Sequence, residues 1–280
     1  METGSFLILH KLKTLKKRQL HIIQQKLVKR KTKMKKIFIK IAALFLVIIF
    51  SNCTEDTTAT AVIPKGTTPP IVDINASKQL TYLALGDSYT IGQSVCETCR
   101  FPEQLRKKLG DLNPKNTYTS KIIATTGWTT TNLISAINAE KPASNYDLVT
   151  LLIGVNNQYQ GKSFSIYENE FPELINKAIA LARGDKSNVI VVSIPDYAFT
   201  PFGKQSSNTS KISSEIDNYN AFAQKYCLER NIEFVSITDI TRQGFVNPLL
   251  VAQDGLHPSE LAYSLFVERI FPKASLAIHN

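Results

Sequence analysis

The stretch Thr81-Tyr-Leu-Ala-Leu-Gly-Asp-Ser-Tyr-Thr90 decides the fold. Its first part, Thr81 to Leu85, is a largely aliphatic run of strand length. Gly86 and Asp87 interrupt this run, because glycine adopts turn geometry easily and aspartate accepts hydrogen bonds from nearby backbone N–H groups. Ser88 therefore stands on a turn just past the end of a buried strand, where open α/β sheets bind ligands. A serine at this place is a candidate nucleophile, and an ordinary polar turn is the alternative.

The alternation of apolar runs continues along the chain. Strands are predicted at 81–85, 117–124, 148–153, 189–194 and 232–237, and helices at 101–109, 131–139, 166–183, 212–230 and 259–270. The run at 148–153 is almost continuously apolar, as in a strand that is buried on both faces. This pattern predicts a three-layer α/β/α, flavodoxin-like fold with a doubly wound parallel sheet of five strands. Residues 79–280 would form this single domain.

The positive charge of the chain lies at its N-terminus. The formal net charge is +10, but residues 1–52 hold 13 of the 33 Lys and Arg residues and one of the 23 acidic residues. The remainder has 20 basic and 22 acidic side chains. The predicted domain therefore has no excess of positive charge to bind backbone phosphates, which argues against nucleic-acid binding.

The N-terminus has the pattern of a targeting segment. Lys35 and Lys36 precede the apolar run Ile41 to Phe50, which is too short to span a bilayer easily. A basic region followed by a short apolar region predicts a signal peptide at 34–52, with Met34 as the candidate start. Residues 1–33 would then be a basic N-terminal extension, or untranslated. A single-pass anchor with a basic flank is the alternative.

The sequence Phe50-Ser51-Asn52-Cys53 resembles the cleavage box of bacterial lipoproteins, in which the cysteine is lipidated. That family usually has Gly, Ala or Ser before the cysteine, where this chain has Asn52. Cleavage after Ala59-Thr60-Ala61 is the competing prediction. Residues 53–78 are rich in Thr and Pro and are expected to form a flexible tether. We therefore expect export to the cell envelope, in the periplasm or at the outer membrane, with a lipid anchor on Cys53.

Three more polar segments follow predicted strands or the crossover after the last one. They are Thr125-Thr126-Gly127-Trp128, Gly154-Val155-Asn156-Asn157 and Asp254-Gly255-Leu256-His257. The carboxyl ends of parallel strands lie at one edge of a sheet, so these segments and Ser88 are expected to meet there.

Together with Gly86-Asp87-Ser88, these segments resemble the conserved blocks of the SGNH, or GDSL, hydrolase family, over about Tyr82 to Phe271. The resemblance implies a serine esterase or lipase. It also implies an oxyanion hole made by the backbone N–H groups of Ser88 and Gly127 and the side-chain amide of Asn156. Asn157 stands where the family usually has Asp, which affects a supporting hydrogen bond rather than the catalytic amide.

The same chemistry follows from the residues themselves. A serine hydroxyl needs a base to become a good nucleophile. The chain has four histidines, His10, His21, His257 and His279. Only His257 lies inside the predicted domain away from its end, and Asp254, three residues earlier, can accept a proton from its ring and fix the tautomer. A structural histidine beside a helix-capping aspartate is the alternative for this pair.

The segment Cys96-Glu97-Thr98-Cys99 is a C-x-x-C pair. In an oxidising compartment it would form a disulfide that closes the loop after the nucleophile. A thiol redox centre would instead lie where a strand opens into a helix. Further Cys or His ligands are missing around this pair, so a zinc site is not expected, and the predicted chemistry needs no metal or cofactor.

Aromatic residues are expected near the active edge, namely Tyr89, Trp128, Tyr159, Tyr197 and Phe199. They could line an acyl or sugar pocket, or pack beneath the loops. The Ser-rich segment Pro195 to Ser210 is the candidate for a substrate-facing or mobile loop.

These observations favour a monomeric, secreted or lipid-anchored serine hydrolase that acts on small-molecule, glycan or lipid esters through an acyl-enzyme on Ser88. Two alternatives are a catalytically silent lipoprotein that binds glycans or other ligands, and a thiol redox protein that uses the cysteine pair.

Overall fold

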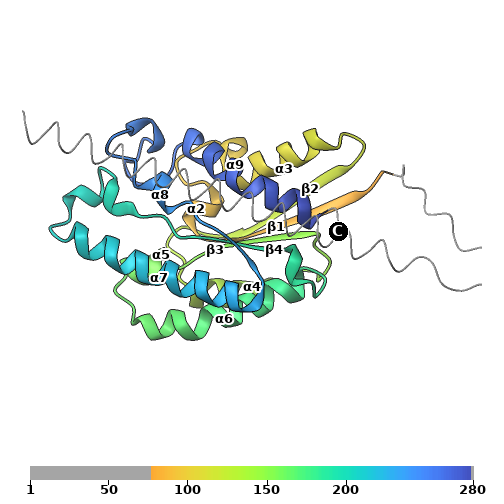
Figure 1. Ribbon diagram of the computed structural model, residues 1–280, viewed down its shortest axis with the longest axis horizontal. Coiled ribbons are helices and arrows are strands. Elements are labelled where there is room, and N and C mark those ends of the chain that lie inside the picture. Colours follow the sequence, from red (N-terminus) through yellow and green to blue (C-terminus); the bar gives the residue numbers. More distant parts are fainter. Residues whose placement is uncertain (1–76, 279–280) are drawn as a thin grey trace, which may run out of the picture. The chain divides into compact units, whose positions relative to one another are not determined.

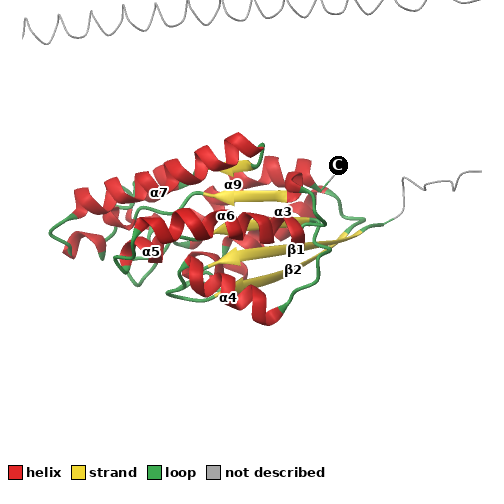
Figure 2. Ribbon diagram, turned by 90° about the horizontal axis from the view of Figure 1, so that it is seen from below, coloured by secondary structure: helices red, strands yellow, loops and turns green. Residues whose placement is uncertain are grey.

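The computed structural model describes residues 77–278, and its centre is a parallel sheet with the strand order β2-β1-β3-β4-β5. The strands are β1 (Gln79–Gly86), β2 (Thr117–Ala124), β3 (Leu148–Leu152), β4 (Val189–Val192) and β5 (Glu233–Val235). All four neighbouring pairs run parallel, and the strand arrows point the same way in Figure 2. The predictions that concern residues 1–33, the signal peptide at 34–52, Cys53 and most of the tether lie outside the described residues.

The burial of the strands follows their order in the sheet. Every residue of β3 and β4, next to each other inside the sheet, is buried, as the apolar sequence predicts. The edge strand β2 alternates between exposed and partly buried residues over most of its length. The predicted doubly wound, three-layer α/β/α fold is confirmed.

Helices cover both faces of the sheet. They are α2 (Ser88–Ile91), α3 (Phe101–Leu112), α4 (Thr130–Glu140), α5 (Val155–Tyr159), α6 (Phe164–Leu181), α7 (Thr209–Arg230), α8 (Thr238–Thr241) and α9 (Glu260–Ala277). Helices α3 and α9 lie side by side on one face, and α4, α6 and α7 lie on the other (Figure 1). No helix within residues 77–278 is long and apolar enough to cross a membrane.

Helices α3 and α9 extend well beyond their predicted C-terminal ends at residues 109 and 270. Helix α3 passes through Gly110 to Leu112, because the buried Leu105 and Leu109 hold it against the core and offset the cost of a glycine in a helix, about 0.5–1 kcal/mol. Helix α9 passes through Pro272, because Ala274 and Ala277 beyond it are buried. Tertiary packing thus outweighs the local stop signals.

The strand order places a topological switch point between β1 and β3. The chain leaves β1 through α3 toward β2, and returns through α4 to β3 on the other side of β1. The loops after β1 and β3 therefore diverge and leave a crevice at the carboxyl ends of the strands, which is where such sheets bind ligands.

Candidate active site

Ser88 lies at the junction of β1 and α2. Strand β1 ends at Gly86, and Asp87 caps α2 by accepting a hydrogen bond on Oδ1 from the Tyr89 backbone N–H at 3.0 Å. A side chain at position 86 would clash, because a Cβ there would lie 2.4 Å from the backbone oxygen of Leu152 on β3. The tight junction holds Ser88 at a fixed place, with 3% of its surface exposed.

His257 is held by Asp254, as the sequence predicts for a base and its orienting acid. His257 Nδ1 lies 2.6 Å from Asp254 Oδ2. The other carboxylate oxygen accepts the backbone N–H groups of Leu256 and His257 at 2.9 and 3.0 Å. These bonds fix the carboxylate against its own loop, so that the imidazole is oriented by a rigid partner and its Nε2 is left for the substrate side.

The pKa of Asp254 is low because of its donors. Partial burial raises the pKa of this carboxyl, but hydrogen bonds from Ser94, the His257 ring and two backbone N–H groups outweigh burial and lower it to about 2. Ser94 Oγ donates to Asp254 Oδ2 at 2.6 Å. Asp254 is therefore a carboxylate at neutral pH and can stabilise an imidazolium on His257.

The three predicted oxyanion donors lie around the same cavity. Ser88, Gly127, Asn156 and His257 all line a cavity of about 230 Å³. Gly127 has a φ of +81°, and a Cβ there would meet nothing within 4 Å. Its backbone conformation, rather than crowding, therefore requires glycine. Within residues 77–278 no hydrogen bond joins Ser88 to His257; such bonds commonly tighten only when substrate is bound.

The Asn156 amide is oriented by two oxygens. Its Nδ2 donates to the backbone oxygen of Trp128 at 3.0 Å and reaches Asp87 Oδ2 at 3.5 Å. The second distance is at the outer limit of a hydrogen bond, so this N–H can turn to a charged oxygen in the cavity. An uncharged amide that is oriented next to Ser88 is the kind of donor that an oxyanion requires.

Asn157, at the position where the resembled family usually has Asp, is hydrogen-bonded through both atoms of its amide. It is fully buried, its Oδ1 accepts the Thr130 backbone N–H at 3.0 Å, and its Nδ2 lies 2.7 Å from Thr130 Oγ1. The amide therefore ties the start of α4 to α5 and leaves no polar atom of its own unbonded.

Asp87 is a buried carboxyl next to Ser88 in the chain. Burial raises its pKa to about 7, against hydrogen bonds from backbone N–H groups and from Asn156 that lower it. Tyr89 and Tyr263 are the other titratable side chains that interact with it. Asp87 supports the turn, as predicted, and it also lies next to Asn156, the predicted oxyanion donor.

Asp87→Asn is expected to remove part of the pH dependence of stability. The raised pKa means that folded Asp87 keeps its proton between about pH 3.8 and 7 while the unfolded chain has lost it, so the free energy of unfolding falls as pH rises through this window. Asn still accepts the Tyr89 N–H but cannot titrate. Urea unfolding at several pH values measures this free energy. Its fall with rising pH should be smaller in Asp87→Asn than in the wild type, and unchanged in Asp111→Asn, a control at an exposed site. A wild-type minus variant difference that does not change with pH would contradict the assignment.

The aromatic predictions divide into two groups. Tyr89, Tyr159 and Tyr197 line the cavity. Trp128 and Phe199 do not line it and pack against the core instead. Phe202 and Leu256 line it without having been predicted, because their place depends on the tertiary course of their loops.

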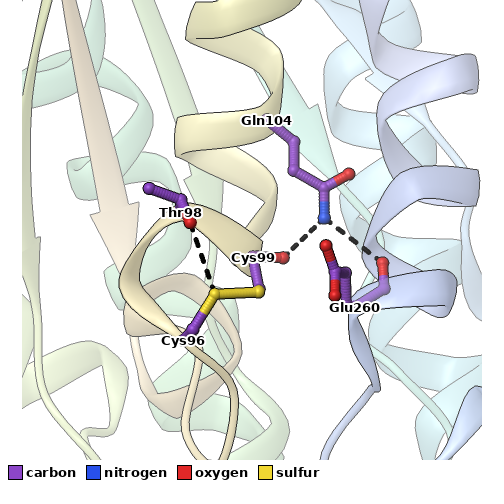
Figure 3. The surroundings of a disulfide bond; sticks show 5 residues. All are labelled: Cys96, Thr98, Cys99, Gln104 and Glu260. Atoms are coloured by element: carbon purple, nitrogen blue, oxygen red, sulfur yellow. Dashed lines mark hydrogen bonds between the residues drawn. A yellow bond between two sulfur atoms is a disulfide. The ribbon is translucent and has the colours of Figure 1, made fainter.

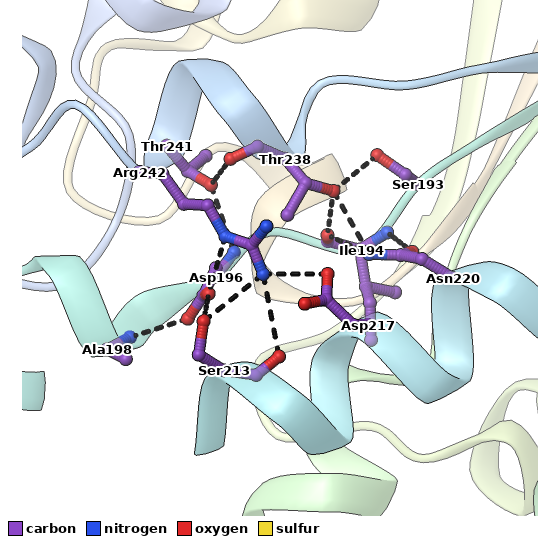
Figure 4. Close-up of polar contacts among 10 residues, drawn as sticks. All are labelled: Ser193, Ile194, Asp196, Ala198, Ser213, Asp217, Asn220, Thr238, Thr241 and Arg242. Atoms are coloured by element: carbon purple, nitrogen blue, oxygen red, sulfur yellow. Dashed lines mark hydrogen bonds and ion pairs between the residues drawn. The ribbon is translucent and has the colours of Figure 1, made fainter. Parts of the chain in front are cut away.

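The predicted loop Pro195 to Ser210 faces the cavity and is anchored by a buried carboxylate. It contains two 3₁₀ helices, Tyr197–Phe199 and Gly203–Gln205. Asp196, whose side chain is fully buried, accepts from Ala198 N and from the side chains of Ser213 and Arg242, and Figure 4 shows these contacts converging from three segments. The network holds Tyr197 at the cavity.

Cys96 and Cys99 form a disulfide in the loop between α2 and α3. The backbone oxygen of Cys99 accepts from Gln104 Nε2, which also reaches the backbone oxygen of Glu260 at the start of α9 (Figure 3). Neither cysteine lines the cavity at Ser88. The remaining cysteine of the described part, Cys227, is buried in α7.

Replacing Cys96 and Cys99 together by Ser is expected to lower stability more than kcat. The ring is very short, so its loss should cost at or below the low end of the usual ~2–4 kcal/mol. Thermal unfolding and ester turnover of the double variant measure the two effects. Full loss of activity on reduction, with an unchanged Tm, would instead give the pair a direct role in the reaction.

Sequence reasoning missed the hydrogen bonds that connect this loop to the site. Ser94 donates to Asp254, and Gln93 Oε1 accepts from Thr126 Oγ1 at 2.7 Å, next to Gly127. A lone serine or glutamine gives no signal in a single sequence, because these contacts join positions far apart in the chain.

Solved structures with this fold include known lipases and acylhydrolases. The chain is similar to a lipase from a goat rumen metagenome, with 17% identity and a TM-score of 0.55 over 70% of this chain and 98% of the other. It is also similar to a lipase/acylhydrolase from Enterococcus faecalis, with 16% identity and a TM-score of 0.53 over 70% and 95% of the two chains. A lipolytic protein of the G-D-S-L family from Veillonella parvula gives 17% identity and a TM-score of 0.52 over 70% and 97%. At these identities the similarity shows the fold. No curated protein matches the chain.

The family is shown by the sequence model of the GDSL-like lipase/acylhydrolases, which matches residues 84–265. This range is more than half of the chain, and it includes the nucleophile junction at Ser88, the Asn156 amide and the Asp254–His257 pair. The chain therefore belongs to the GDSL-like lipase/acylhydrolase family.

Proposed function

We propose that this protein is a serine hydrolase that cleaves carboxylic esters through an acyl-enzyme on Ser88. The observation that carries the proposal is the 2.6 Å contact between Asp254 and His257, with His257, Ser88 and the Asn156 amide all lining one cavity. A nucleophile, an oriented base and an oxyanion donor are the parts that acyl transfer requires.

The proposed reaction has two steps, acylation of Ser88 and hydrolysis of the acyl-enzyme. Ser88 Oγ attacks the ester carbonyl carbon while His257 takes the hydroxyl proton, and the backbone N–H groups of Ser88 and Gly127 and the Asn156 amide bind the oxyanion. The C–O bond to the alcohol breaks, and the alcohol leaves with the proton from His257. Water then attacks the acyl-enzyme with His257 as base, which releases the carboxylic acid and restores Ser88.

The size of the cavity supports a short acyl group. Its volume of about 230 Å³ lies below the ~300–1,000 Å³ that hold drug-sized ligands, and Val155, Leu256 and aromatic side chains give it an apolar wall. A binding protein without catalysis would need no carboxylate-oriented base in the cavity that Ser88 lines. The cysteines are bonded as a disulfide and line no part of this cavity, which argues against a thiol redox function there.

Hydrolysis of a chain-length series of 4-nitrophenyl esters by the chain from about Thr54 onward tests the function. We expect turnover of the acetate and butyrate esters and a fall in kcat/KM for longer acyl chains. The control is Ser88→Ala in the same preparation. If no ester of the series is hydrolysed, the proposed function is wrong, and the catalytically silent binding protein becomes the preferred alternative.

We also propose that the protein is exported to the cell envelope and anchored by a lipid on Cys53. The support is the sequence alone: Lys35 and Lys36, the apolar run to Phe50, and the cysteine that follows. Expressed from Met34 in a bacterium that processes lipoproteins, the protein should partition with membranes, and Cys53→Ala should release it or leave it unprocessed. Mass spectrometry that finds an unmodified Cys53 in the mature chain would reject the anchor but not export.

A further inference from the structure

A second, larger groove adjoins the catalytic cavity. It has a volume of about 980 Å³ and runs beside α7. Tyr159, Tyr197 and Phe202 line both spaces, so the groove and the cavity share this wall. A molecule bound at Ser88 that extends past these three side chains would enter the groove.

A backbone hydrogen bond connects the groove wall to the loop that carries His257. The backbone N–H of Phe202 donates to the backbone oxygen of Gly255 at 2.9 Å, two residues before His257. His257 gives its proton to the leaving alcohol, so the alcohol must lie next to it. The groove wall is thus held next to the loop of the general acid, which supports an assignment of the groove to the alcohol side of the ester.

The groove combines one exposed aromatic ring, that of Tyr159, with an ordered set of polar groups. Tyr159 is 56% exposed, and the centre of its ring lies 5.8 Å from that of Tyr197, with 82° between the ring planes. Tyr197 donates to Gln158 at 2.8 Å, Gln158 donates to Glu215 at 2.9 Å, and Lys211 pairs with Glu215 at 2.8 Å. These hydrogen bonds and this ion pair hold an amide, a carboxylate and an ammonium group in fixed positions beside the rings.

The polar groups of the groove favour a carbohydrate over a lipid chain as its ligand. A long hydrocarbon chain in the groove would displace water from Lys211 and Glu215 without forming hydrogen bonds to them. Desolvation of charged side chains in this way weakens binding. Sugar hydroxyls replace those hydrogen bonds, and the apolar face of a sugar ring can lie on an exposed aromatic ring such as Tyr159.

We propose that this groove binds the alcohol part of the ester, and that this alcohol is a carbohydrate longer than one sugar ring that carries a short acyl group. The proposal rests on the ester hydrolysis proposed above. Hydrolysis would move the acyl group to Ser88 and then to water, and would leave the sugar hydroxyl free with the proton from His257.

The test compares ester substrates that differ only on the alcohol side. The full chain is assayed with 4-nitrophenyl acetate and with O-acetylated mono- to tetrasaccharides of xylose, glucose, mannose and N-acetylglucosamine. We expect kcat/KM to rise about tenfold or more from one ring to several for at least one of these sugars, since each added contact of hot-spot size is worth about that much. 4-Nitrophenyl palmitate should be a poor substrate.

Two α7 variants locate the effect. Asn218→Ala, in the groove, should lower the ratio of oligosaccharide to 4-nitrophenyl acetate turnover, whereas Gln224→Ala, an exposed amide on the same helix outside the groove, should not. Turnover of 4-nitrophenyl acetate that depends on Ser88, without a gain from any oligosaccharide or with preference for the palmitate ester, would overturn the groove proposal alone. No turnover of any ester would overturn the proposed function with it.

A separate observation concerns Ser94, which we infer to be a positioning residue for the Asp254–His257 pair. Its hydroxyl donates to Asp254 Oδ2 at 2.6 Å, the same oxygen that contacts His257. Its φ is +68°, a conformation that residues with a side chain rarely adopt. The loop is held in place by the Gln93–Thr126 bond before it and the Cys96–Cys99 disulfide after it. Ser94 thus supplies the donor that keeps the carboxylate aimed at the imidazole.

Two substitutions at this position separate positioning from stability. Ser94→Gly removes the hydroxyl and accepts the positive φ without strain, so the Tm should not fall. Its kcat should fall about tenfold, as for loss of one hydrogen bond to a charged group. The acidic limb of its kcat/KM profile should move to higher pH, because Asp254 with one donor fewer attracts the imidazolium proton more strongly. Ser94→Asn, which tolerates the conformation and offers an N–H, should restore part of kcat.

Ser144→Gly is the matched control, because Ser144 is exposed in the loop before β3, at the opposite edge of the sheet. It should match the wild type in kcat and in pH profile. A Ser94→Gly enzyme with wild-type kcat and profile would overturn the positioning role and leave the proposed hydrolysis standing, since that depends on Ser88.

Discussion

Ser88→Ala and His257→Ala are each expected to lower ester turnover by several orders of magnitude. The hydroxyl of Ser88 forms the acyl-enzyme, and it reacts only when His257 takes its proton, so the two residues act as one unit. The double variant should then be little slower than either single variant. Initial rates with 4-nitrophenyl acetate measure all three, and thermal unfolding confirms that each variant is folded.

The acid of the proposed triad should matter less than the base. Asp254→Asn keeps a polar group at the position but loses the charge that stabilises the imidazolium, so its loss of kcat should be smaller than that of His257→Ala. Ser135→Ala, an exposed serine on α4 whose hydroxyl bonds its own helix, serves as the control and should keep wild-type turnover. A Ser88→Ala variant with near wild-type turnover in a clean preparation would reject the serine-hydrolase proposal.

Asn156→Ala is expected to lower kcat by about 10²–10³, the usual loss for one oxyanion donor. The effect should fall on kcat more than on KM, because the amide binds the oxygen only once it is charged. Asn138→Ala, which removes an exposed amide on α4 that accepts from Lys177, is the matched control. A loss confined to KM would mean that Asn156 binds the ester itself, and the oxyanion hole would then consist of backbone N–H groups alone.

The sheet and its order of elements could be predicted because burial leaves a clear trace in the sequence. The runs at 148–153 and 189–194 are apolar on both sides of the strand, and β3 and β4 are buried accordingly. Their ends are marked by glycine or proline. Once the strands were predicted as parallel, the loops that carry Ser88, Gly127, Asn156 and His257 had to meet at one edge.

The parts that could not be predicted depend on contacts between distant segments. Ser94 reaches Asp254 across 160 positions of the chain, and Phe202 lines the cavity because its backbone bonds to Gly255. The ends of α3 and α9 were wrong for a related reason: Gly110 and Pro272 are local stop signals, and packing against the core overrides them. Asp87 looked like a turn residue and nothing more, because the burial that raises its pKa is a property of the folded state.

Labelling with a fluorophosphonate probe tests the central claim most directly, because it reports on the nucleophile and needs no knowledge of the natural ester. The folded wild-type protein should carry one probe group, and peptide mapping by mass spectrometry should place it on Ser88. Labelling should be lost in Ser88→Ala and strongly reduced in His257→Ala, since the base activates the hydroxyl. A protein that hydrolyses esters but is labelled at another residue, or is not labelled at all, would contradict the assignment of Ser88 as the nucleophile.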